Sequence, residues 1–457
     1  MPFYQPPKNQ RSKKRSITTP LPSQPLTLFV TKLSDDGRGI AKYEGKTIFV
    51  SGALPGETVR AQLTRVKPRF SEAKVTQLMT ISDDRVEPRC LLTHRCGGCS
   101  VQHLTLEQQV VFKQDIVLSQ LKRWSAIEPV EVLPPITSHG FAYRQRVRLA
   151  VDYSKAKELF FGFRESGSHR LVSINECAVL SERLSTLLPM IKQWLGQIPN
   201  QIVSHIELID SATGPSIVVR HTRQLARAAR QQLGDLLMPC GVFNVWFQGE
   251  KEGGLATMEE QVVDPRLMYR LDDFSLSMHF HPQDFIQANH AVNQHMVRQA
   301  VELLAPQADE HIVDLFCGIG NFSLALAKYA KQVVGIEGVA PMVQRAADNA
   351  STNGLDNTHF AVNDLANATG LFKPIFDIGT KVESVLLDPP RSGAKVVCEH
   401  IGLLAPQRIV YVSCDSATFA RDAQVLVANG YKLSKLGILD MFPHTSHVEV
   451  MSLFETV

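Results

Sequence analysis

The strongest constraint on the fold is a rhythm of strand, turn and helix that repeats from about Phe285 to the C-terminus. Four apolar runs of strand length occur here, at 311–316, 332–336, 385–387 and 409–412. Strands that alternate with helices pair in parallel, and the helices cover both faces of the sheet. The sequence therefore predicts a doubly wound α/β domain over residues 281–457, in a chain whose 457 residues allow roughly two to four domains.

The first of these units contains a glycine turn. The strand ending at Phe316 leads into Cys317–Asn321, which contains two glycines, and a helix is expected from Phe322 to Ala330. Three glycines suit the pyrophosphate of a dinucleotide, whereas a turn with two better fits S-adenosylmethionine. Glu337 ends the next strand, where a carboxylate can hold ribose hydroxyls. The sequence therefore predicts a nucleoside-cofactor site.

Two further acidic residues, Asp314 and Asp364, lie at or near strand ends in the same domain. The carboxyl ends of parallel strands form the edge of the sheet where ligands bind. Each acid has an alternative interpretation as a helix cap or a solvated loop charge, which is most plausible for Asp364.

Two loops are expected to open over the same pocket. The strand 385–387 runs into Asp388-Pro389-Pro390-Arg391, and the strand 409–412 runs into Ser413-Cys414. The prolines hold the first loop rigid, so that it can present carbonyl groups to a planar base. A lone cysteine at a strand end is more often a small buried residue, but beside this loop Cys414 is a candidate nucleophile.

A second group of cysteines lies far upstream. Cys90, Cys96 and Cys99 fall within ten residues around a glycine pair, and Cys177 follows alone. Such thiols can surround a zinc ion or an iron–sulfur cluster, and spacing does not distinguish the two. Eight unevenly spaced cysteines are typical of a reducing compartment. The remaining Cys240 and Cys398 are expected in the core.

The N-terminal part has a different pattern. Residues 1–22 form a basic leader that we expect to be disordered and attracted to phosphate. Residues 23–82 contain short strands separated by glycine turns, which predict a small β-barrel. Basic residues surround Phe70 there, as on proteins that bind single-stranded nucleic acid, although a solvated sheet face has the same composition. Residues 83–280 mix strands and helices and predict an α+β domain.

No apolar stretch is long enough to span a membrane, and the basic N-terminus does not lead into a signal-type segment. We therefore expect a cytoplasmic protein with no membrane association.

Together, these motifs resemble the RNA 5-methyluridine methyltransferase family, most closely its members that act on large-subunit ribosomal RNA and carry a TRAM domain. The resemblance covers nearly the whole chain. It rests on Asp36–Gly39 through Lys74–Val75, the four cysteines, Phe285–Asn289, Asp314–Asn321, Asp388–Arg391, Ser413-Cys414 and His447–Glu449. Two departures are visible. Asp415-Ser416 stands where many relatives have Asn-Pro, and Asp364 stands where an asparagine is common.

The resemblance implies an α/β fold with a Rossmann-like S-adenosylmethionine-dependent methyltransferase domain, an N-terminal OB-like barrel (TRAM) and an α+β central domain. It implies a 4Fe-4S cluster on Cys90, Cys96, Cys99 and Cys177. It implies S-adenosylmethionine contacts at Gln287, Phe316, Asn321, Glu337, Asp364 and Asp388. The expected partner is 23S ribosomal RNA and not DNA, and the expected state is a monomer.

The chemistry of uracil methylation explains why a cysteine and a carboxylate are needed. The C5 carbon of uracil is too weak a nucleophile to attack a sulfonium directly. Addition of the Cys414 thiolate at C6 makes an enolate whose C5 can attack the methyl group. Glu449 is placed in the sequence to remove the extra C5 proton, after which Cys414 leaves. The alternation of the last strand permits a site-facing Glu449. His444 and His447 could assist, although loop histidines are more often solvated.

Other interpretations remain open from the sequence. An amino-group methyltransferase would share the cofactor site without needing Cys414. A radical S-adenosylmethionine enzyme usually has tighter cysteine spacing and leaves one iron open, whereas Cys177 can supply a fourth ligand. Transfer RNA is the alternative substrate, and a non-enzymatic RNA-binding protein with a metal site is the alternative of a different class.

Overall fold

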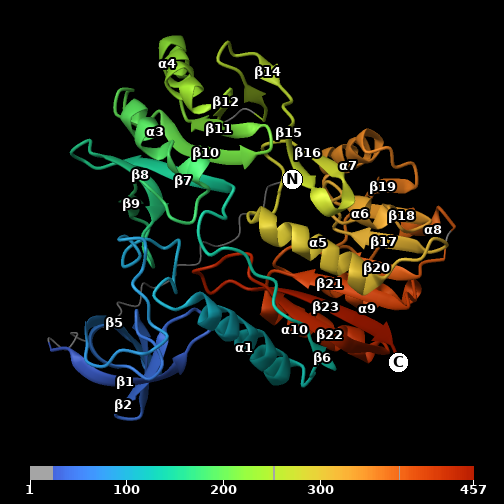
Figure 1. The fold of residues 1–457 in the computed structure, drawn as a ribbon, viewed down its shortest axis with the longest axis horizontal. Coiled ribbons are helices and arrows are strands. Elements are labelled where there is room, and N and C mark those ends of the chain that lie inside the picture. Colours follow the sequence, from blue (N-terminus) through green and yellow to red (C-terminus); the bar gives the residue numbers. More distant parts are fainter. Residues whose placement is uncertain (1–23, 251–252, 380) are drawn as a thin grey trace, which may run out of the picture. The chain divides into compact units, whose positions relative to one another are not determined.

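The computed structural model describes residues 24–250, 253–379 and 381–457 (Figure 1). The predicted leader, residues 1–22, lies outside the described residues. Contacts divide the chain into two compact units, one ending at Arg85 and the other spanning Val86–Val457. Within the described ranges, no helix has both the length and the apolar character needed to cross a membrane.

The first unit contains a closed barrel of five strands in the order β1-β2-β3-β5-β4. The strands are β1 (Leu26–Leu33), β2 (Gly39–Tyr43), β3 (Lys46–Ser51), β4 (Thr58–Val66) and β5 (Phe70–Leu78). Alternate side chains point inward and form a core that includes Leu28, Val30 and Val59. On the barrel, Phe70 packs edge-on against Phe49, with 5.5 Å between ring centroids, and the Lys67 ammonium lies 4.7 Å from the Phe70 centroid. The predicted barrel is confirmed.

In the second unit, the sheet nearest the N-terminus has eight strands in the order β14-β13-β12-β11-β10-β7-β8-β9. Their bounds are β7 (Arg146–Tyr153), β8 (Leu159–Arg164), β9 (Leu171–Ser173), β10 (Val203–Ser211), β11 (Gly214–His221), β12 (Asn244–Gly249), β13 (Leu255–Ala256) and β14 (Val262–Val263). The helices of this region are α2 (Glu182–Ser185), α3 (Leu188–Leu195), α4 (Arg227–Leu237) and the 3₁₀ turn η1 (Met238–Cys240). Their apolar residues, among them the fully buried Trp194, pack with the sheet in one core.

The C-terminal sheet also has eight strands, in the order β19-β18-β17-β20-β21-β23-β22-β6. Its strands are β6 (Glu131–Val132), β17 (His311–Leu315), β18 (Gln332–Glu337), β19 (Thr358–Val362), β20 (Ser384–Leu387), β21 (Arg408–Ser413), β22 (Tyr431–Leu439) and β23 (Glu449–Thr456). From β19 to β21 all pairs are parallel, as predicted, whereas β23 pairs antiparallel to β21 and β22. A two-stranded hairpin of β15 (Leu267–Leu271) and β16 (Leu276–Phe280) precedes the sheet, joined by the 3₁₀ turn η2 (Asp272–Phe274).

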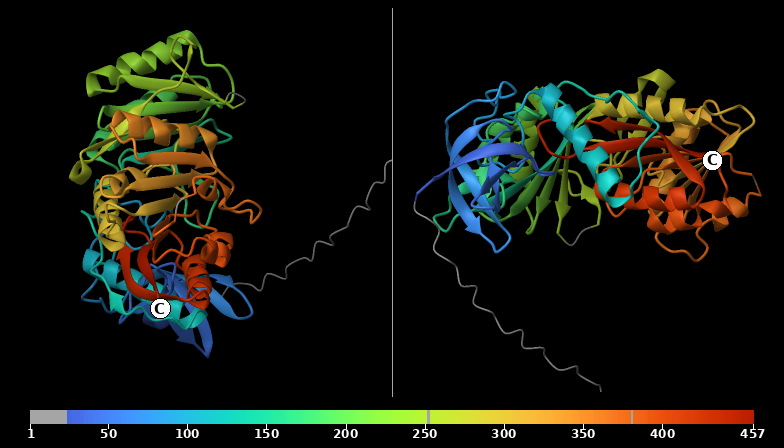
Figure 2. Two further views of the ribbon diagram at one scale, coloured as in Figure 1. Left: turned by 90° about the vertical axis from the view of Figure 1, so that its right-hand side faces the viewer. Right: turned by 90° about the horizontal axis from the view of Figure 1, so that it is seen from below.

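Helices cover both faces of this sheet and enclose two separate cores. They are α5 (His290–Leu304), α6 (Ser323–Ala327), α7 (Ala340–Thr352), α8 (Lys373–Phe376), α9 (Lys395–His400), the 3₁₀ turn η3 (Ile401–Leu403) and α10 (Ser416–Ala428). One covering helix, α1 (Leu106–Trp124), comes from much earlier in the chain and packs against α10. Both views in Figure 2 show α1, in cyan, beside the red C-terminal strands. The strand order reverses between β17 and β20, and the loops after these strands therefore diverge and leave a crevice.

Candidate active site

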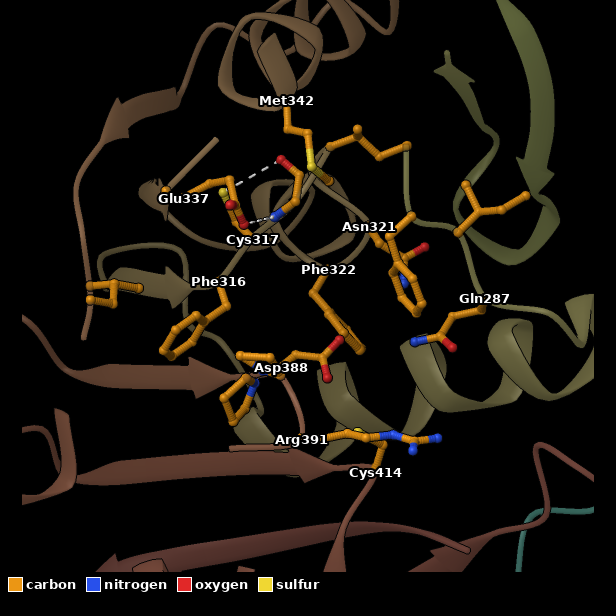
Figure 3. A pocket seen from close by; sticks show the side chains of 18 of the residues that line it. Gln287, Phe316, Cys317, Asn321, Phe322, Glu337, Met342, Asp388, Arg391 and Cys414 are labelled. Carbon is orange, nitrogen blue, oxygen red and sulfur yellow. Dashed lines mark hydrogen bonds between the residues drawn. The ribbon is translucent and has the colours of Figure 1, made fainter. Parts of the chain in front are cut away.

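A cavity of about 600 Å³ opens at the carboxyl ends of the parallel strands. Figure 3 shows Asp388, Arg391 and Cys414 along one side of this pocket and Met342 on the opposite side. All eight residues predicted for cofactor binding or catalysis line it: Gln287, Phe316, Asn321, Glu337, Asp364, Asp388, Cys414 and Glu449. The fold therefore brings together, from seven separate loops and strand ends, the residues that the sequence singled out.

The glycine turn after β17 shapes one wall of the pocket. Phe316 has a φ of +66°, a left-handed conformation that is uncommon for a bulky residue and typical of functional sites. Gly320 has a φ of +91°, and a Cβ there would lie 2.4 Å from the Leu324 side chain, so only glycine fits. The Gly318 N–H donates to Glu337 Oε2 at 3.3 Å, and the Val339 N–H donates to Oε1 at 3.0 Å. The turn thus holds the Glu337 carboxylate at the edge of the pocket.

Asn321 is held by side chains that sequence reasoning did not identify. The Tyr269 hydroxyl donates to Asn321 Oδ1 at 2.8 Å, and Asn321 Nδ2 donates to Asn293 Oδ1 at 3.0 Å. These bonds fix the orientation of the Asn321 amide. Tyr269 comes from β15 and Asn293 from α5, and no local motif marks either residue. Met342 also lines the pocket and was not singled out from the sequence. Phe285 and Arg391 line it as well, and the sequence placed both in motifs without giving either a role of its own.

The segment carrying Gln287 is anchored by the other sheet of the same unit. The Arg146 guanidinium, at the start of β7, donates to the carbonyls of Pro282 and Asp284 and to Glu207 Oε1. The Gln145 N–H donates to the Ala288 carbonyl at 2.9 Å. These bonds hold the backbone on both sides of Gln287. The sheet that contains β7 therefore determines where the Gln287 side chain enters the pocket.

Asp314, which the sequence places at or near a strand end on the ligand-binding edge, is not among the described residues that line the pocket. Its side chain is fully buried below the pocket, and Oδ2 accepts a hydrogen bond from the Ser323 hydroxyl at the start of α6. Burial raises the pKa of Asp314 to about 7. The carboxyl therefore ties β17 to the following helix.

Cys414 and Glu449 are brought together by strand register. Cys414 follows β21 and Glu449 begins β23, and these strands pair antiparallel with Ser413 opposite Val450. Asp388 follows β20, the neighbour of β21 on its other side. The three side chains therefore converge on one end of the pocket, although in the sequence Cys414 and Glu449 are separated by the whole of α10 and β22.

Burial has a large effect on the acid–base properties of this group. It raises the pKa of Glu449 to about 8, and the nearby Asp388 adds to the rise while Arg391 opposes it. Burial also raises the pKa of Asp388 to about 7. The pKa of the Cys414 thiol rises to about 11 through burial and the charges of Glu449 and Asp388, with Arg391 again opposing. A cation entering the pocket would favour the ionised form of all three groups.

The two departures from the family pattern have local roles. Asp415 caps α10, because its Oδ1 accepts from the N–H groups of Ala417 and Thr418 at 3.1 and 2.9 Å. Asp364 is exposed at the rim, and its Oδ1 accepts from the Ala366 N–H at 3.0 Å. Asp364 thus combines a pocket position with the solvated loop position that was its alternative interpretation.

The two histidines of the loop before β23 are not among the described residues that line the pocket. His444 is buried, with its ring stacked on Phe141 at 4.4 Å between centroids, and it adopts a left-handed φ of +68°. Burial lowers the pKa of His444 to about 4, so the ring is neutral at pH 7. A catalytic role in contact with substrate is therefore not supported for His444 or His447.

The four upstream cysteines line a second cavity, of about 320 Å³. These residues are Cys90, Cys96, Cys99 and Cys177. Burial and the neighbouring thiols raise the pKa of Cys99 to about 12. In the described part of the chain, no three His, Cys, Asp or Glu side chains are close enough together to hold a single metal ion.

The two cysteines expected in the core, Cys240 and Cys398, differ in their exposure to solvent. Cys398 is fully buried, as predicted. Cys240 is exposed at the end of η1, where its thiol contacts Met190 Sδ at 3.6 Å, so that prediction is wrong. Cys240 ends a short turn before a left-handed Gly241, and such turns run along the surface.

Comparison with known proteins agrees with this architecture. A family model described as tRNA (Uracil-5-)-methyltransferase matches residues 105–457, and a TRAM domain model matches residues 24–76. The 23S rRNA (uracil(1939)-C(5))-methyltransferase RlmD of Pseudomonas fluorescens is 44% identical over 437 residues, covering 94% of this chain and 91% of that protein. The protein of the same name from Hahella chejuensis is 40% identical, covering 95% of this chain and 98% of that protein.

A solved structure is similar over the same length. The Pyrococcus abyssi tRNA (uracil-54, C5)-methyltransferase, in complex with S-adenosyl-L-homocysteine, superposes with a TM-score of 0.68 and 26% identity. The match covers 94% of this chain and all of that one. Since the uracil-5 model matches well over half of the chain and the curated relatives match almost all of it, the chain belongs to the tRNA (uracil-5-)-methyltransferase family.

Proposed function

We propose that the chain transfers the methyl group of S-adenosylmethionine to C5 of a uridine in 23S ribosomal RNA. The observation that carries this proposal is the convergence of Cys414, Glu449 and Asp388 on one end of a pocket large enough for a nucleoside cofactor and a base. The identity of 40–44% to two relatives named as 23S rRNA methyltransferases supports ribosomal RNA over transfer RNA. The tRNA-modifying neighbour is only 26% identical.

In this proposal the methyl donor occupies the part of the pocket near the glycine turn. Glu337 holds the ribose hydroxyls, Phe316 packs against the adenine, and Gln287, Asn321 and Asp388 contact the polar end of the donor. The Cys317–Asn321 turn brings the backbone close to the ligand, since its two glycines carry no side chains. The uracil then enters at the end that holds Cys414, after leaving its stack in the RNA.

Each chemical step is assigned to a residue. The Cys414 thiolate adds to C6, which forms the C6–S bond and moves the electron pair of the C5–C6 double bond toward C5 and O4. C5 then attacks the methyl carbon, and its bond to the sulfonium sulfur breaks. The Glu449 carboxylate removes the proton left on C5, the double bond forms again, and the C6–S bond breaks to release Cys414.

The decisive experiment uses a 23S rRNA fragment in which the target uridine is replaced by 5-fluorouridine. Fluorine cannot leave C5 as a proton does, so the protein–RNA adduct should persist after one methyl transfer. We expect a band on denaturing gels that requires S-adenosylmethionine, and peptide mapping should place the RNA on Cys414. A parallel reaction with transfer RNA tests the alternative substrate. Absence of an adduct with every RNA, alongside tight RNA binding, would contradict the enzymatic proposal.

We also predict that affinity for S-adenosylmethionine depends on pH. The raised pKa values of Asp388 and Glu449, about 7 and 8, mean that both carboxyls are mainly neutral below pH 7. A sulfonium cation binds more tightly to the ionised pocket, so its affinity should rise about tenfold between pH 6 and pH 8. S-adenosylhomocysteine has the same groups but a neutral sulfur and should change much less.

Calorimetric titrations of both ligands over this pH range measure the ratio of their dissociation constants. The variant Asp388→Asn removes one titrating carboxyl, so that ratio should change less with pH than it does in wild type. Parallel pH profiles for the two ligands would show that the buried carboxyls do not sense the sulfonium charge.

We further propose that Cys90, Cys96, Cys99 and Cys177 hold a 4Fe-4S cluster. The four thiols share one cavity. Four cysteine thiolates are the donor set that such a cluster takes, and this shared cavity is the observation that supports the proposal. When bound, the cluster would link the 90–99 loop to Cys177 and neutralise the buried thiolates.

Metal analysis of anaerobically purified protein checks this proposal. We expect about four iron atoms per chain and loss of iron in Cys99→Ser and Cys177→Ser. The control Cys240→Ser changes an exposed cysteine away from the cavity and should keep its iron. Stoichiometric zinc in place of iron would contradict the proposal. The monomeric state, the cytoplasmic location and the exclusion of DNA remain predictions.

A further inference from the structure

The loop between β22 and β23, Met441–Val448, is held by an unusual series of contacts to distant parts of the chain. Its carbonyls at four successive residues each accept a hydrogen bond from outside the loop. The donors are Asn289 Nδ2 to Met441 at 3.4 Å, Lys113 Nζ to Phe442 at 2.9 Å, Tyr143 Oη to Pro443 at 3.2 Å, and the Ser100 and Val101 N–H groups to His444 at 2.9 and 3.0 Å. These bonds hold the backbone at every residue of the first half of the loop, 441–444, and the second half leads into Glu449.

The last of these contacts joins the loop to the cysteine site. Ser100 and Val101 come immediately after Cys99, which lines the cavity of the four cysteines. The Ser446 N–H also donates to Ser100 Oγ at 3.1 Å. A short chain of covalent and hydrogen bonds therefore runs from Cys99 through Ser100 and the 441–448 loop to Glu449.

Helix α1 reinforces the same loop. Gln109 Oε1 accepts from the His444 N–H at 2.7 Å, while Gln109 Nε2 lies 3.2 Å from His444 Nδ1 and donates to the Leu104 carbonyl at 2.8 Å. His444 is buried in a left-handed conformation, which persists only when surrounding contacts determine it. The buried ammonium of Lys113, 2.5 Å from Asp440 Oδ1, fixes the start of the loop.

We propose that the cysteine-bearing segment positions Glu449 through the 441–448 loop, so that weakening the loop contacts slows proton removal from C5 more than it slows methyl transfer. This inference rests on the function and the cluster proposed above. Gln109 and His444 are positioning residues in this scheme, because neither is among the described residues that line the pocket. Glu449 is the first residue of β23, so pairing with Leu439 holds its backbone on the strand side and the 441–448 loop holds the chain that leads into it.

Proton removal is slowed more than methyl transfer because of the order of the chemical steps. In this scheme the Cys414 thiol loses its proton to solvent before it adds to C6, and C5 attacks the methyl group without a base, so neither step uses Glu449. After methyl transfer, the C5 proton must pass to the Glu449 carboxylate before the C6–S bond breaks. A misplaced carboxylate therefore leaves the methylated adduct attached to Cys414, with the donor already converted to S-adenosylhomocysteine.

The test compares Gln109→Met with wild type on unmodified RNA. Methionine keeps the length and apolar packing but loses the bonds to His444. We expect the single-turnover rate of methyl transfer to stay within about threefold of wild type, while the steady-state turnover rate falls by about tenfold or more. A covalent RNA adduct should become visible on denaturing gels. Gln109→Glu keeps an acceptor for the His444 N–H and should recover turnover in part. Lys122→Met, on the exposed end of α1, is the matched control and should match wild type.

A milder variant and a direct measurement keep the inference testable if Gln109→Met folds poorly. Ser100→Ala removes only the bond to Ser446 and should accumulate the adduct to a smaller extent. Hydrogen exchange at 444–448 should become faster when iron is removed by a chelator, which reports on the loop independently of activity. An equal fall in both kinetic steps, or exchange unaffected by iron removal, would overturn the inference. Failure of wild type to form the 5-fluorouridine adduct would instead overturn the proposed function.

Discussion

Replacement of Cys414 by serine is expected to reduce methyl transfer by a factor of about 10⁴ or more, because the proposed reaction has no other route to an electron-rich C5. A serine hydroxyl is a far weaker acid than a thiol, and the pocket already raises the pKa of Cys414 to about 11. An alkoxide would be still less accessible beside Glu449 and Asp388. The measurement is transfer of labelled methyl groups to a 23S rRNA fragment under single-turnover conditions.

Two controls make the Cys414→Ser result specific. Binding of S-adenosylhomocysteine should be unchanged, since Cys414 lies at the end of the pocket assigned to uracil. The 5-fluorouridine adduct should be absent. Cys240→Ser changes an exposed cysteine that is not among the residues lining the pocket, and it should keep adduct formation. Retained turnover in Cys414→Ser would favour a direct mechanism, such as that of an amino-group methyltransferase.

The second large effect is expected for Glu449→Gln. Turnover should fall by about 10²–10⁴, the usual contribution of a positioned general base, while the first methyl transfer proceeds. The covalent adduct should then accumulate on unmodified RNA, which wild type releases. Denaturing gels and mass spectrometry of the Cys414 peptide measure this difference. Release of methylated RNA at the wild-type rate would show that another group removes the proton.

Glu449→Gln should also stabilise the folded protein. The pKa of Glu449 is about 8 in the folded state, against an ordinary value of 4.5. Because the folded carboxyl keeps its proton longer than the unfolded one, its stabilising contribution is full below pH 4.5 and is lost as the pH rises through 8. Glutamine stays neutral throughout. The variant should therefore exceed wild type in free energy of unfolding by about 2–4 kcal/mol at pH 9, with little difference near pH 4.

Thermal unfolding of both proteins across this pH range gives the comparison. A gain in stability together with a loss of turnover is the expected signature of a carboxylate kept buried for catalysis. If Glu449→Gln were less stable than wild type at pH 9, the carboxylate would have a stabilising partner that the described residues do not show.

Much of the C-terminal domain could be predicted because its signals are local. The apolar runs that became β17, β18, β20 and β21 are short and bounded by turn residues, and parallel strands place their carboxyl ends at one edge. The sequence predicted the ends of the helices and strands less accurately than their order. The helix expected over 322–330 is observed only as α6, Ser323–Ala327.

The supporting residues of the site could not be predicted in the same way. Tyr269 and Asn293 orient Asn321, and Arg146 anchors the segment of Gln287, yet each comes from an element far away in the chain. Polar contacts between distant elements leave no periodic pattern in a sequence. The same reason applies to the packing of α1 against α10, two helices that lie far apart in the chain.

The sequence by itself determined the strand–turn–helix order, the glycine turn and the barrel, because spacing along the chain carries these features. The resemblance to a known family, and not spacing, implied cofactor contacts such as Gln287 and Phe316. Only the tertiary structure decided that Asp314 lies below the pocket, that Cys240 is exposed, and that the loop after Asp440 connects the cysteine site to Glu449. Those outcomes depend on which distant segments of the chain pack and form hydrogen bonds with one another after folding, and spacing along the sequence does not encode such contacts.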